Sequence, residues 1–229
     1  MEQLVLELSQ PPVSTLVSFV PGSNGEAVAA LHAWLAGALE ERCIYLWGPR
    51  GCGKTHLLRA ATLVAQEGGR IAAYVDAGEI ETLEQAAALP SVIIVDDVDR
   101  LSIAAQGALF RLFQRVREED ARMLAAGNAA PVGLALREDV RTRLGAGLVF
   151  QLRLLSDAQK AEALRGHAGG RGFALSPEII DYLLRHGQRD LPSLLTVLDA
   201  LDQYSLQTKR PITLPLLREV LHPANTTPK

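Results

Sequence analysis

One eight-residue segment constrains the fold of this chain more than any other feature of its sequence. Residues 48–55 read Gly-Pro-Arg-Gly-Cys-Gly-Lys-Thr; they follow the apolar run 43–47, and their last two residues begin the helix-like segment 54–67. The pattern G-x-x-x-x-G-K-T between a buried strand and a helix is typical of a phosphate-binding loop. Its glycines let successive N–H groups point at one anion, and the helix N-terminus adds partial positive charge. We therefore predict a phosphate site here; a glycine-rich turn with a surface lysine is the alternative.

The residue types in this loop indicate particular contacts. Lys54 is expected to pair with β- and γ-phosphate oxygens, and Thr55 to supply a hydroxyl to Mg²⁺. The expected cofactors are therefore ADP or ATP, with Mg²⁺. The nucleotide-binding candidates are Gly48, Pro49, Arg50, Gly51, Cys52, Gly53, Lys54, Thr55 and His56.

Two adjacent acids follow a second apolar run. Residues 92–95 read Val-Ile-Ile-Val and lead directly into Asp96 and Asp97. Carboxylates at the carboxyl end of a strand, beside a phosphate loop, suit magnesium binding and water positioning. We expect Asp96, with Thr55, to lie on the metal side, and Asp97 to polarise water. A pair of helix-capping aspartates is the alternative.

Strand-like and helix-like segments alternate over the first two thirds of the chain. This alternation predicts right-handed crossovers and an α/β fold with a mostly parallel sheet flanked by helices. Asn24 is expected to cap the first helix. The expected strands are 43–47, 71–75, 91–95, 122–126 and 148–152, and the expected helices are 26–39, 54–67 and 102–118. In the last of these helices Leu109, Leu112, Phe113 and Val116 share one face.

Only helical patterns follow residue 155. Ser156 with Gln159 predicts a capping box, and Ser176 with Pro177 predicts an N-cap followed by proline at the first helical position. Two further helical segments span Leu191 to Leu206 and Thr213 to Leu221. The expected domains are an N-terminal tail (1–12), a nucleotide-binding base (13–155), a small all-α lid (156–222) and a C-terminal tail (223–229).

Composition excludes several classes of protein. The chain has 229 residues, of which 48% are hydrophobic and 21% charged, which excludes disorder over most of its length. No apolar run approaches the roughly 18 residues of a membrane span, and the N-terminus shows no secretory signal pattern. Two cysteines, Cys43 and Cys52, exclude a disulfide scaffold and favour a cytoplasmic location. A net charge of −3 disfavours tight autonomous DNA binding.

The motifs together resemble those of the DnaA-related AAA+ ATPase family, from about residue 16 to residue 222. The resemblance is carried by the phosphate loop, the Asp96-Asp97 pair and the segments Phe19–Asn24, Ala125–Asn128 and Val140–Leu144. It implies an AAA+ base domain followed by a helical lid. It also implies that Asn128 is the polar residue of the first sensor, which orients water near the γ-phosphate. A loop asparagine is the alternative for Asn128.

The resemblance assigns a role to Arg143. The matching arginine in the family is a finger that reaches into a neighbour's nucleotide site and stabilises the transferring phosphoryl group. Here Arg143 would act in trans on ATP held by DnaA. A surface arginine on a short solvated helix is the alternative, and Arg141 is a second candidate for the finger.

The N-terminal tail resembles a sliding-clamp-binding peptide. Residues 3–8 read Gln-Leu-Val-Leu-Glu-Leu, close to the form Q-L-x-L-x-L, in which Gln3, Leu4, Leu6 and Leu8 would contact the clamp. Glu7 stands where such peptides often have proline, which is expected to weaken binding. An edge strand, or a tail with accidental leucines, is the alternative.

One position departs from the family pattern. The second sensor of AAA+ proteins is an arginine at the start of a lid helix, and Pro192 matches that position here. Proline cannot contact phosphate through its side chain, and Arg189 is the nearest substitute. The departure implies weak or absent autonomous ATP hydrolysis.

A nucleotide-binding core with a short tail is similar in layout to the regulatory inactivators of DnaA within this family. The implied function is negative regulation of DNA replication initiation. The implied partners are DnaA, the DNA polymerase III sliding clamp (β subunit) and DNA indirectly through the clamp, with a homodimer as a further option and no membrane. The alternative function is a self-hydrolysing AAA+ ATPase that acts as a helicase loader or initiation factor.

Overall fold

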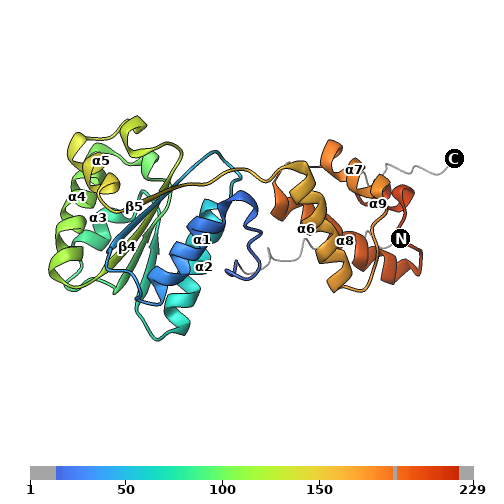
Figure 1. The fold of residues 1–229 in the computed structure, drawn as a ribbon, viewed down its shortest axis with the longest axis horizontal. Coiled ribbons are helices and arrows are strands. Elements are labelled where there is room, and N and C mark those ends of the chain that lie inside the picture. The colour runs from blue at the N-terminus through green and yellow to red at the C-terminus, as the bar shows by residue number, and fades with distance from the viewer. Residues whose placement is uncertain (1–13, 188–189, 222–229) are drawn as a thin grey trace, which may run out of the picture. The chain divides into compact units, whose positions relative to one another are not determined.

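The computed structural model describes residues 14–187 and 190–221, which form two compact units. The base unit comprises residues 14–154 and has an α/β fold (Figure 1). The lid unit comprises residues 155–221 of the described chain and contains helices without strands. Within the described residues, no helix combines the length and apolar character that crossing a bilayer requires.

The base unit is built on a five-stranded sheet in which every neighbouring pair is parallel. The strand order is β2-β3-β4-β1-β5, so β2 and β5 form the two edges. This arrangement confirms the parallel α/β sheet expected from the alternating pattern. The strands are β1 (Cys43–Trp47), β2 (Ala72–Val75), β3 (Val92–Val95), β4 (Arg122–Gly127) and β5 (Leu148–Gln151).

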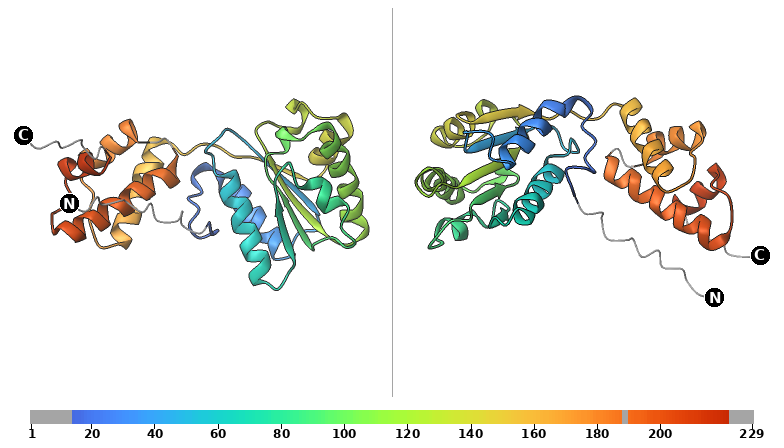
Figure 2. Two further views of the ribbon diagram at one scale, coloured as in Figure 1. Left: turned by 180° about the vertical axis from the view of Figure 1, so that it is seen from behind. Right: turned by 60° about the horizontal axis from the view of Figure 1, so that its bottom comes forward.

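Helices cover both faces of the sheet (Figure 2). One face carries α1 (Gly25–Leu35) and α2 (Lys54–Glu67), and the other carries α3 (Ile80–Glu84), α4 (Ile103–Glu118) and α5 (Glu138–Gly145). Short 3₁₀ turns, η1 (Gly22–Asn24), η2 (Val98–Arg100) and η3 (Pro131–Gly133), connect these elements.

Each face of the sheet has its own apolar core. Side chains alternate along a strand, so Ile44 and Leu46 of β1 pack toward α1 and α2, while Tyr45 packs toward α4. The predicted apolar face of α4 is confirmed, because it is buried in the second of these cores. The four residues of that face are Leu109, Leu112, Phe113 and Val116.

Helix α1 is shorter than the sequence predicted. It ends at Leu35 rather than at residue 39, because Gly37 adopts a left-handed backbone with φ +77°. The Ala38 N–H donates to the Ala33 oxygen at 2.9 Å and the Gly37 N–H to the Trp34 oxygen at 3.1 Å. These two bonds form a Schellman motif, which stops the helix despite the helix-forming residues beyond it.

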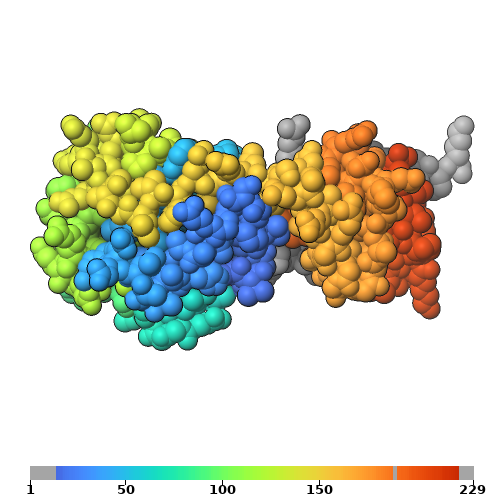
Figure 3. Space-filling model, in the orientation of Figure 1, coloured from blue at the N-terminus to red at the C-terminus, as the bar shows by residue number. Residues whose placement is uncertain are grey.

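The prediction that Asn24 caps α1 with its side chain is wrong. The side chain makes no cap bond; its amide donates to the Arg153 oxygen at 3.0 Å and its carbonyl oxygen accepts from the Arg153 N–H at 2.7 Å. Asn24 is only 3% exposed. It therefore fixes the start of α1 to the segment after β5, which lies beside α1 in the space-filling view (Figure 3).

The lid unit contains α6 (Asp157–Gly170), α7 (Pro177–His186), α8 (Leu191–Thr208) and α9 (Leu214–Leu221). The predicted capping box is confirmed, because Ser156 accepts from the Gln159 N–H while the Gln159 side chain accepts from the Ser156 N–H. Ser176 caps α7, with proline at its start, as predicted. Leucines from all four helices form a separate core, which includes Leu164, Leu183, Leu198 and Leu217.

Candidate nucleotide-binding site

The loop between β1 and α2 has the shape of a phosphate cradle. Gly51 and Gly53 have φ +84° and +98°, a left-handed backbone that other residues rarely adopt. A Cβ on Gly48 would lie 2.2 Å from the Leu152 oxygen, and one on Gly53 would lie 2.5 Å from the ring of Phe19. Only glycine fits at both positions, and Gly53 leads directly into the N-terminus of α2.

Lys54 is held over this loop. Its side chain is 7% exposed, and its ammonium donates to the oxygens of Gly48 at 2.7 Å and Pro49 at 3.2 Å. Carbonyl oxygens are weaker partners for a cation than phosphate oxygens are. Lys54 is thus positioned to exchange these bonds for bonds to a phosphate.

The remaining loop residues fall into two groups. Pro49, Arg50 and Gly51 are exposed at the tip, whereas Cys52 is buried, and burial raises the pKa of its thiol. His56, in the first turn of α2, contacts the segment before α1: its Nε2 lies 2.9 Å from the Thr15 oxygen and 3.3 Å from the Ser18 hydroxyl.

Asp96 and Thr55 come together at the carboxyl edge of the sheet. Asp96 directly follows β3 and is 6% exposed; the Thr55 hydroxyl donates to its Oδ2 at 2.7 Å. The hydroxyl of Tyr74, on neighbouring β2, donates to the same oxygen at 2.7 Å, and the Asp97 N–H donates to Oδ1 at 2.9 Å. The predicted metal-side pair thus occupies one site.

Asp97 follows Asp96 directly, and Asn128 is bonded to Asp99, two residues further along. Asp97 has φ +49°, a left-handed backbone for a residue that is not glycine, and its Oδ2 is 3.6 Å from an Arg100 guanidinium nitrogen. Asp97 precedes η2 but makes no side-chain cap bond there, and the cap of the next helix, α4, is Ser102. Asn128, at the end of β4, donates from its side chain to Asp99 at 2.6 Å and from its N–H to Asp99 at 3.0 Å.

These residues fit a nucleotide with Mg²⁺. The glycine cradle and Lys54 suit phosphate oxygens, and Asp96 with Thr55 supplies one carboxylate and one hydroxyl. No cluster of three or more His, Cys, Asp or Glu side chains is found in the described parts of the chain. Mg²⁺ is commonly held by one or two carboxylates together with substrate phosphates, so this donor set is sufficient only with a nucleotide present.

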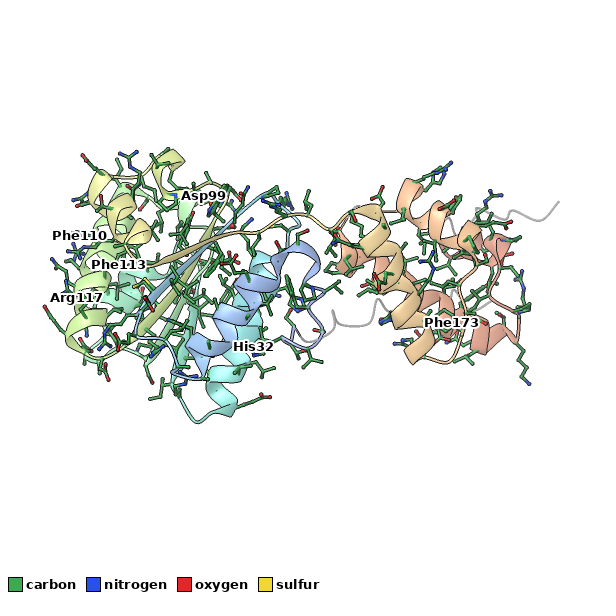
Figure 4. The ribbon with its side chains drawn as sticks, in the orientation of Figure 1. His32, Asp99, Phe110, Phe113, Arg117 and Phe173 are labelled. Atoms are coloured by element: carbon green, nitrogen blue, oxygen red, sulfur yellow. The ribbon has the colours of Figure 1, made fainter. Side chains whose placement is uncertain are left out.

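Arg143 lies outside this cradle. It is in the last turn of α5, and its guanidinium carbon is 5.9 Å from the centre of the Phe110 ring on α4. It borders an open hollow of about 700 Å³ whose lining contains no residue of the phosphate loop and neither Asp96 nor Asp97. Figure 4 labels Phe110 on the outer side of α4 and Asp99 at another edge of the base unit. The lining residues are Phe110, Arg137, Glu138, Asp139, Thr142, Arg143 and Ala146.

Arg141, the second candidate for the finger, is engaged by its own chain. Its guanidinium donates to the Val132 oxygen at 3.3 Å, and its Nε is buried without a hydrogen-bond partner among the described residues. Arg143 is therefore the better placed of the two arginines to meet another molecule.

Two predicted sites lie beyond the described residues. The clamp-binding candidates Gln3, Leu4, Leu6 and Leu8 are outside them, as is Arg189. Pro192 is described and lies in the first turn of α8, where Asp190 accepts from the Ser193 N–H at 3.0 Å.

Sequence reasoning missed two residues that shape the site: Tyr74 bonds Asp96, and Asp99 holds Asn128. Asp99 carried a sequence signal, because it follows the Asp96-Asp97 pair by two residues. Phe19 belongs to a segment that carries the family resemblance, but the packing of its ring on Gly53 was not expected. The contacts of Tyr74 and Phe19 join distant segments, so local patterns do not reveal them.

The parallel sheet, the phosphate loop and the acid pair after β3 together give the base unit an AAA+ fold. Residues 44–146 match the model of the ATPase family associated with various cellular activities (AAA), and residues 157–221 match the model described as Hda, lid domain. The chain thus combines a domain that matches the AAA model with a lid that matches the Hda lid model, which is consistent with an AAA+ protein related to Hda and DnaA.

Solved structures share the fold. Domain III of the replication initiation protein DnaA from Thermotoga maritima matches with a TM-score of 0.76 and 19% identity, over 92% of this chain and 96% of that one. AMPPCP-bound DnaA from Aquifex aeolicus matches with a TM-score of 0.72 and 20% identity, over 86% and 67%. The Thermotoga maritima RuvB Holliday junction branch migration motor matches with a TM-score of 0.66 and 16% identity, over 91% and 71%.

Proposed function

We propose that this chain is a nucleotide-bound AAA+ adaptor that, with the DNA-loaded sliding clamp, stimulates hydrolysis of the ATP bound to DnaA. DnaA would thereby be inactivated, and initiation of DNA replication restrained. The match of residues 157–221 to the Hda lid model supports this class of regulator. The observation that carries the proposal is the position of Arg143, which faces an open hollow and not its own phosphate loop.

Arg143 would act on a nucleotide held by DnaA. An arginine keeps its positive charge at any physiological pH, and its planar guanidinium can donate two parallel hydrogen bonds to phosphate oxygens. Such a finger offsets charge that develops on the transferring phosphoryl group and is worth about 10³–10⁵ in rate. The ring of Phe110 flanks the guanidinium and restricts its directions.

The chain's own cradle would hold a nucleotide as a structural ligand, most simply ADP. The backbone of residues 48–53 and Lys54 would bind the phosphates, while Thr55 and Asp96 would hold Mg²⁺. When bound, Mg²⁺ neutralises phosphate charge. Pro192, in the first turn of α8, would stand where the resemblance puts the second-sensor arginine, which supports slow or absent turnover by the chain alone.

Gln3, Leu4, Leu6 and Leu8 would bind the clamp. An extended peptide with one amide and alternating leucines can dock in an apolar groove. Tethering converts the encounter with DnaA on the same DNA into a nearly intramolecular one, which raises the local concentration of Arg143. The chain would then meet DNA only through the clamp, in the cytoplasm.

A homodimer would be the inactive form if its interface covered Arg143. Nucleotide would shift the balance between dimer and monomer. Light scattering with and without ADP measures this shift, and an unchanged mass contradicts the dimer.

A reconstituted hydrolysis assay tests the central proposal. Clamp is loaded on DNA, DnaA carrying radiolabelled ATP is added, and ADP is followed with and without this chain. We expect ADP formation to rise, and Arg143→Ala to abolish the rise because the charge near the phosphoryl group is lost. Gln3→Ala should also abolish the rise, because the chain would no longer be tethered to the clamp.

Arg141→Ala is the matched control, since it removes the same charge from the same helix two residues away. It should retain most of the stimulation, because Arg141 is bound to the Val132 oxygen. Loss of stimulation in Arg141→Ala but not in Arg143→Ala would assign the finger to Arg141. A rise that persists in both variants contradicts the arginine-finger proposal.

One observation favours a second function, a self-hydrolysing AAA+ ATPase that acts as a helicase loader or initiation factor. Lys54, Thr55, Asp96, Asp97 and Asn128 all lie on one unit, so the groups for hydrolysis are present in a single chain. The same assay separates the two functions. ADP formed by this chain alone, with no stimulation of DnaA, would favour the ATPase.

A further inference from the structure

Asp96 shares one oxygen between two hydroxyl donors that come from different elements. Its Oδ2 accepts from Thr55 on α2 and from Tyr74 on β2, each at 2.7 Å. Its other oxygen is occupied by the Asp97 N–H at 2.9 Å. The carboxylate is therefore fixed from three sides in a position that is 6% exposed.

Tyr74 reaches Asp96 because of the register of the sheet. Tyr74 pairs with Ile94 on β3, two residues before Asp96, so a side chain as long as tyrosine spans the remaining distance along the strand. Arg59, one helical turn after Thr55 on α2, lies over the ring with its guanidinium carbon 6.0 Å from the ring centre. Ring and hydroxyl are thus both held in place.

The Thr55 and Tyr74 hydroxyls have different expected roles when a nucleotide binds. Thr55 belongs to the phosphate loop motif, in which its hydroxyl is needed by Mg²⁺. Tyr74 belongs to the edge strand β2 and is not part of that motif. With Thr55 engaged by the metal, the phenol is the hydroxyl that continues to orient Oδ2.

We propose that Tyr74 is a positioning residue that orients Asp96 and thereby sets the Mg²⁺ dependence of nucleotide binding. This inference rests on the nucleotide-binding part of the proposed function. Groups that orient a metal-side ligand typically contribute 10–100-fold to metal affinity. A merely structural tyrosine would change stability and leave the Mg²⁺ dependence unaltered.

Binding of a fluorescent ADP, N-methylanthraniloyl-ADP, to the full chain tests the proposal. The titration is run in EDTA and over a series of Mg²⁺ concentrations, for wild type and Tyr74→Phe. Phenylalanine keeps the ring and removes only the hydroxyl. The Mg²⁺ half-point is the Mg²⁺ concentration at which half of the Mg²⁺-dependent gain in ADP affinity is reached. We expect this half-point to rise about tenfold in the variant, while the affinity for ADP in EDTA stays unchanged.

Tyr45→Phe is the matched control. Tyr45 is also a buried phenol of the sheet, but its hydroxyl donates to the Ala129 oxygen at 2.8 Å and does not touch Asp96. Its Mg²⁺ half-point should equal that of wild type. In an Asp96→Asn background, Tyr74→Phe should have no further effect, because the carboxylate through which it acts is gone.

The outcomes distinguish the two proposals. An unchanged or lowered Mg²⁺ half-point in Tyr74→Phe, or an equal shift in the Asp96→Asn background, overturns the role of Tyr74 and leaves the proposed function standing. A wild type whose ADP binding ignores Mg²⁺ also overturns it. A wild type that binds no ADP under any condition overturns nucleotide binding itself.

Discussion

Gly53 combines a left-handed backbone with a close neighbour, and these two constraints can be separated. Gly53 has φ +98° and faces the ring of Phe19, whereas Gly69 has φ +75° with open space around it. Gly69→Ala should therefore cost about 1–2 kcal/mol in unfolding free energy, for the backbone alone. Gly53→Ala should cost a further 1–3 kcal/mol or so, because the added methyl overlaps the ring.

Urea unfolding of both glycine variants measures the difference. Equal losses would mean that Phe19 moves aside freely. In that case the ring does not fix the conformation of the phosphate loop.

Titration of the Cys43 thiol is expected to lower the free energy of unfolding at alkaline pH. Burial raises its pKa from 9.0 to about 11, against the lowering effect of Arg143 and Arg42. Between these values the unfolded chain loses a proton that the folded chain keeps, so stability falls as pH rises. We expect Cys43 to contribute roughly 1–3 kcal/mol to the fall between pH 9 and pH 11.

Unfolding free energies at several pH values for wild type and Cys43→Ala test this contribution. The variant should show a shallower fall, whatever its absolute stability. Cys52 is the internal comparison, because its thiol pKa is also raised and should leave a residual slope. Parallel slopes in wild type and variant would contradict a role for Cys43.

At the scale of elements, Asn24 and Ser102 both precede a helix, but only Ser102 caps one, whereas Asn24 joins two segments that are distant in the sequence. Ser102 accepts from the Ala105 N–H at 3.0 Å and caps α4. Asn24 instead bonds both backbone groups of Arg153. Ser102→Ala should cost about 1 kcal/mol, as caps do. Asn24→Ala leaves the two part-buried backbone groups of Arg153 without their side-chain partner and should cost about 1–3 kcal/mol.

Chemical denaturation ranks the two variants. Hydrogen exchange should also show faster exchange at the Arg153 N–H in Asn24→Ala only. If Ser102→Ala proves the more damaging change, the bonds between Asn24 and Arg153 contribute little to holding α1 beside the end of β5.

At the scale of the whole molecule, the two units have separate cores. Leu58 is fully buried in the base core between α2 and the sheet, and Leu198 is fully buried in the lid core. Each unit should therefore unfold in its own transition. Leu58→Ala should lower the stability of the base and Leu198→Ala that of the lid, by about 2–5 kcal/mol each.

Calorimetry of the full chain shows whether the transitions are distinct. Mg²⁺ with ADP should raise the base transition, because the cradle lies on that unit. A single transition lowered equally by both variants would mean that base and lid unfold together.

The sequence alone determined the features that depend on neighbours along the chain. The phosphate loop, the acid pair after β3, the capping box at Ser156 and the parallel α/β class all follow from local spacing and periodicity. The physical reason is that a strand–loop–helix unit and a helix cap are closed by residues within a few positions of each other. Gly37 shows the limit, because one left-handed glycine ended α1 where helix-forming residues continue.

Only the tertiary structure decided which distant groups meet. It bonds Tyr74 to Asp96, Asn24 to Arg153 and Asp99 to Asn128. Strand order and register determine these pairs, and neither can be predicted from any single segment of the sequence. The same holds for Arg143: its place in α5 beside α4, outside the chain's own cradle, is a property of how the helices pack on the sheet.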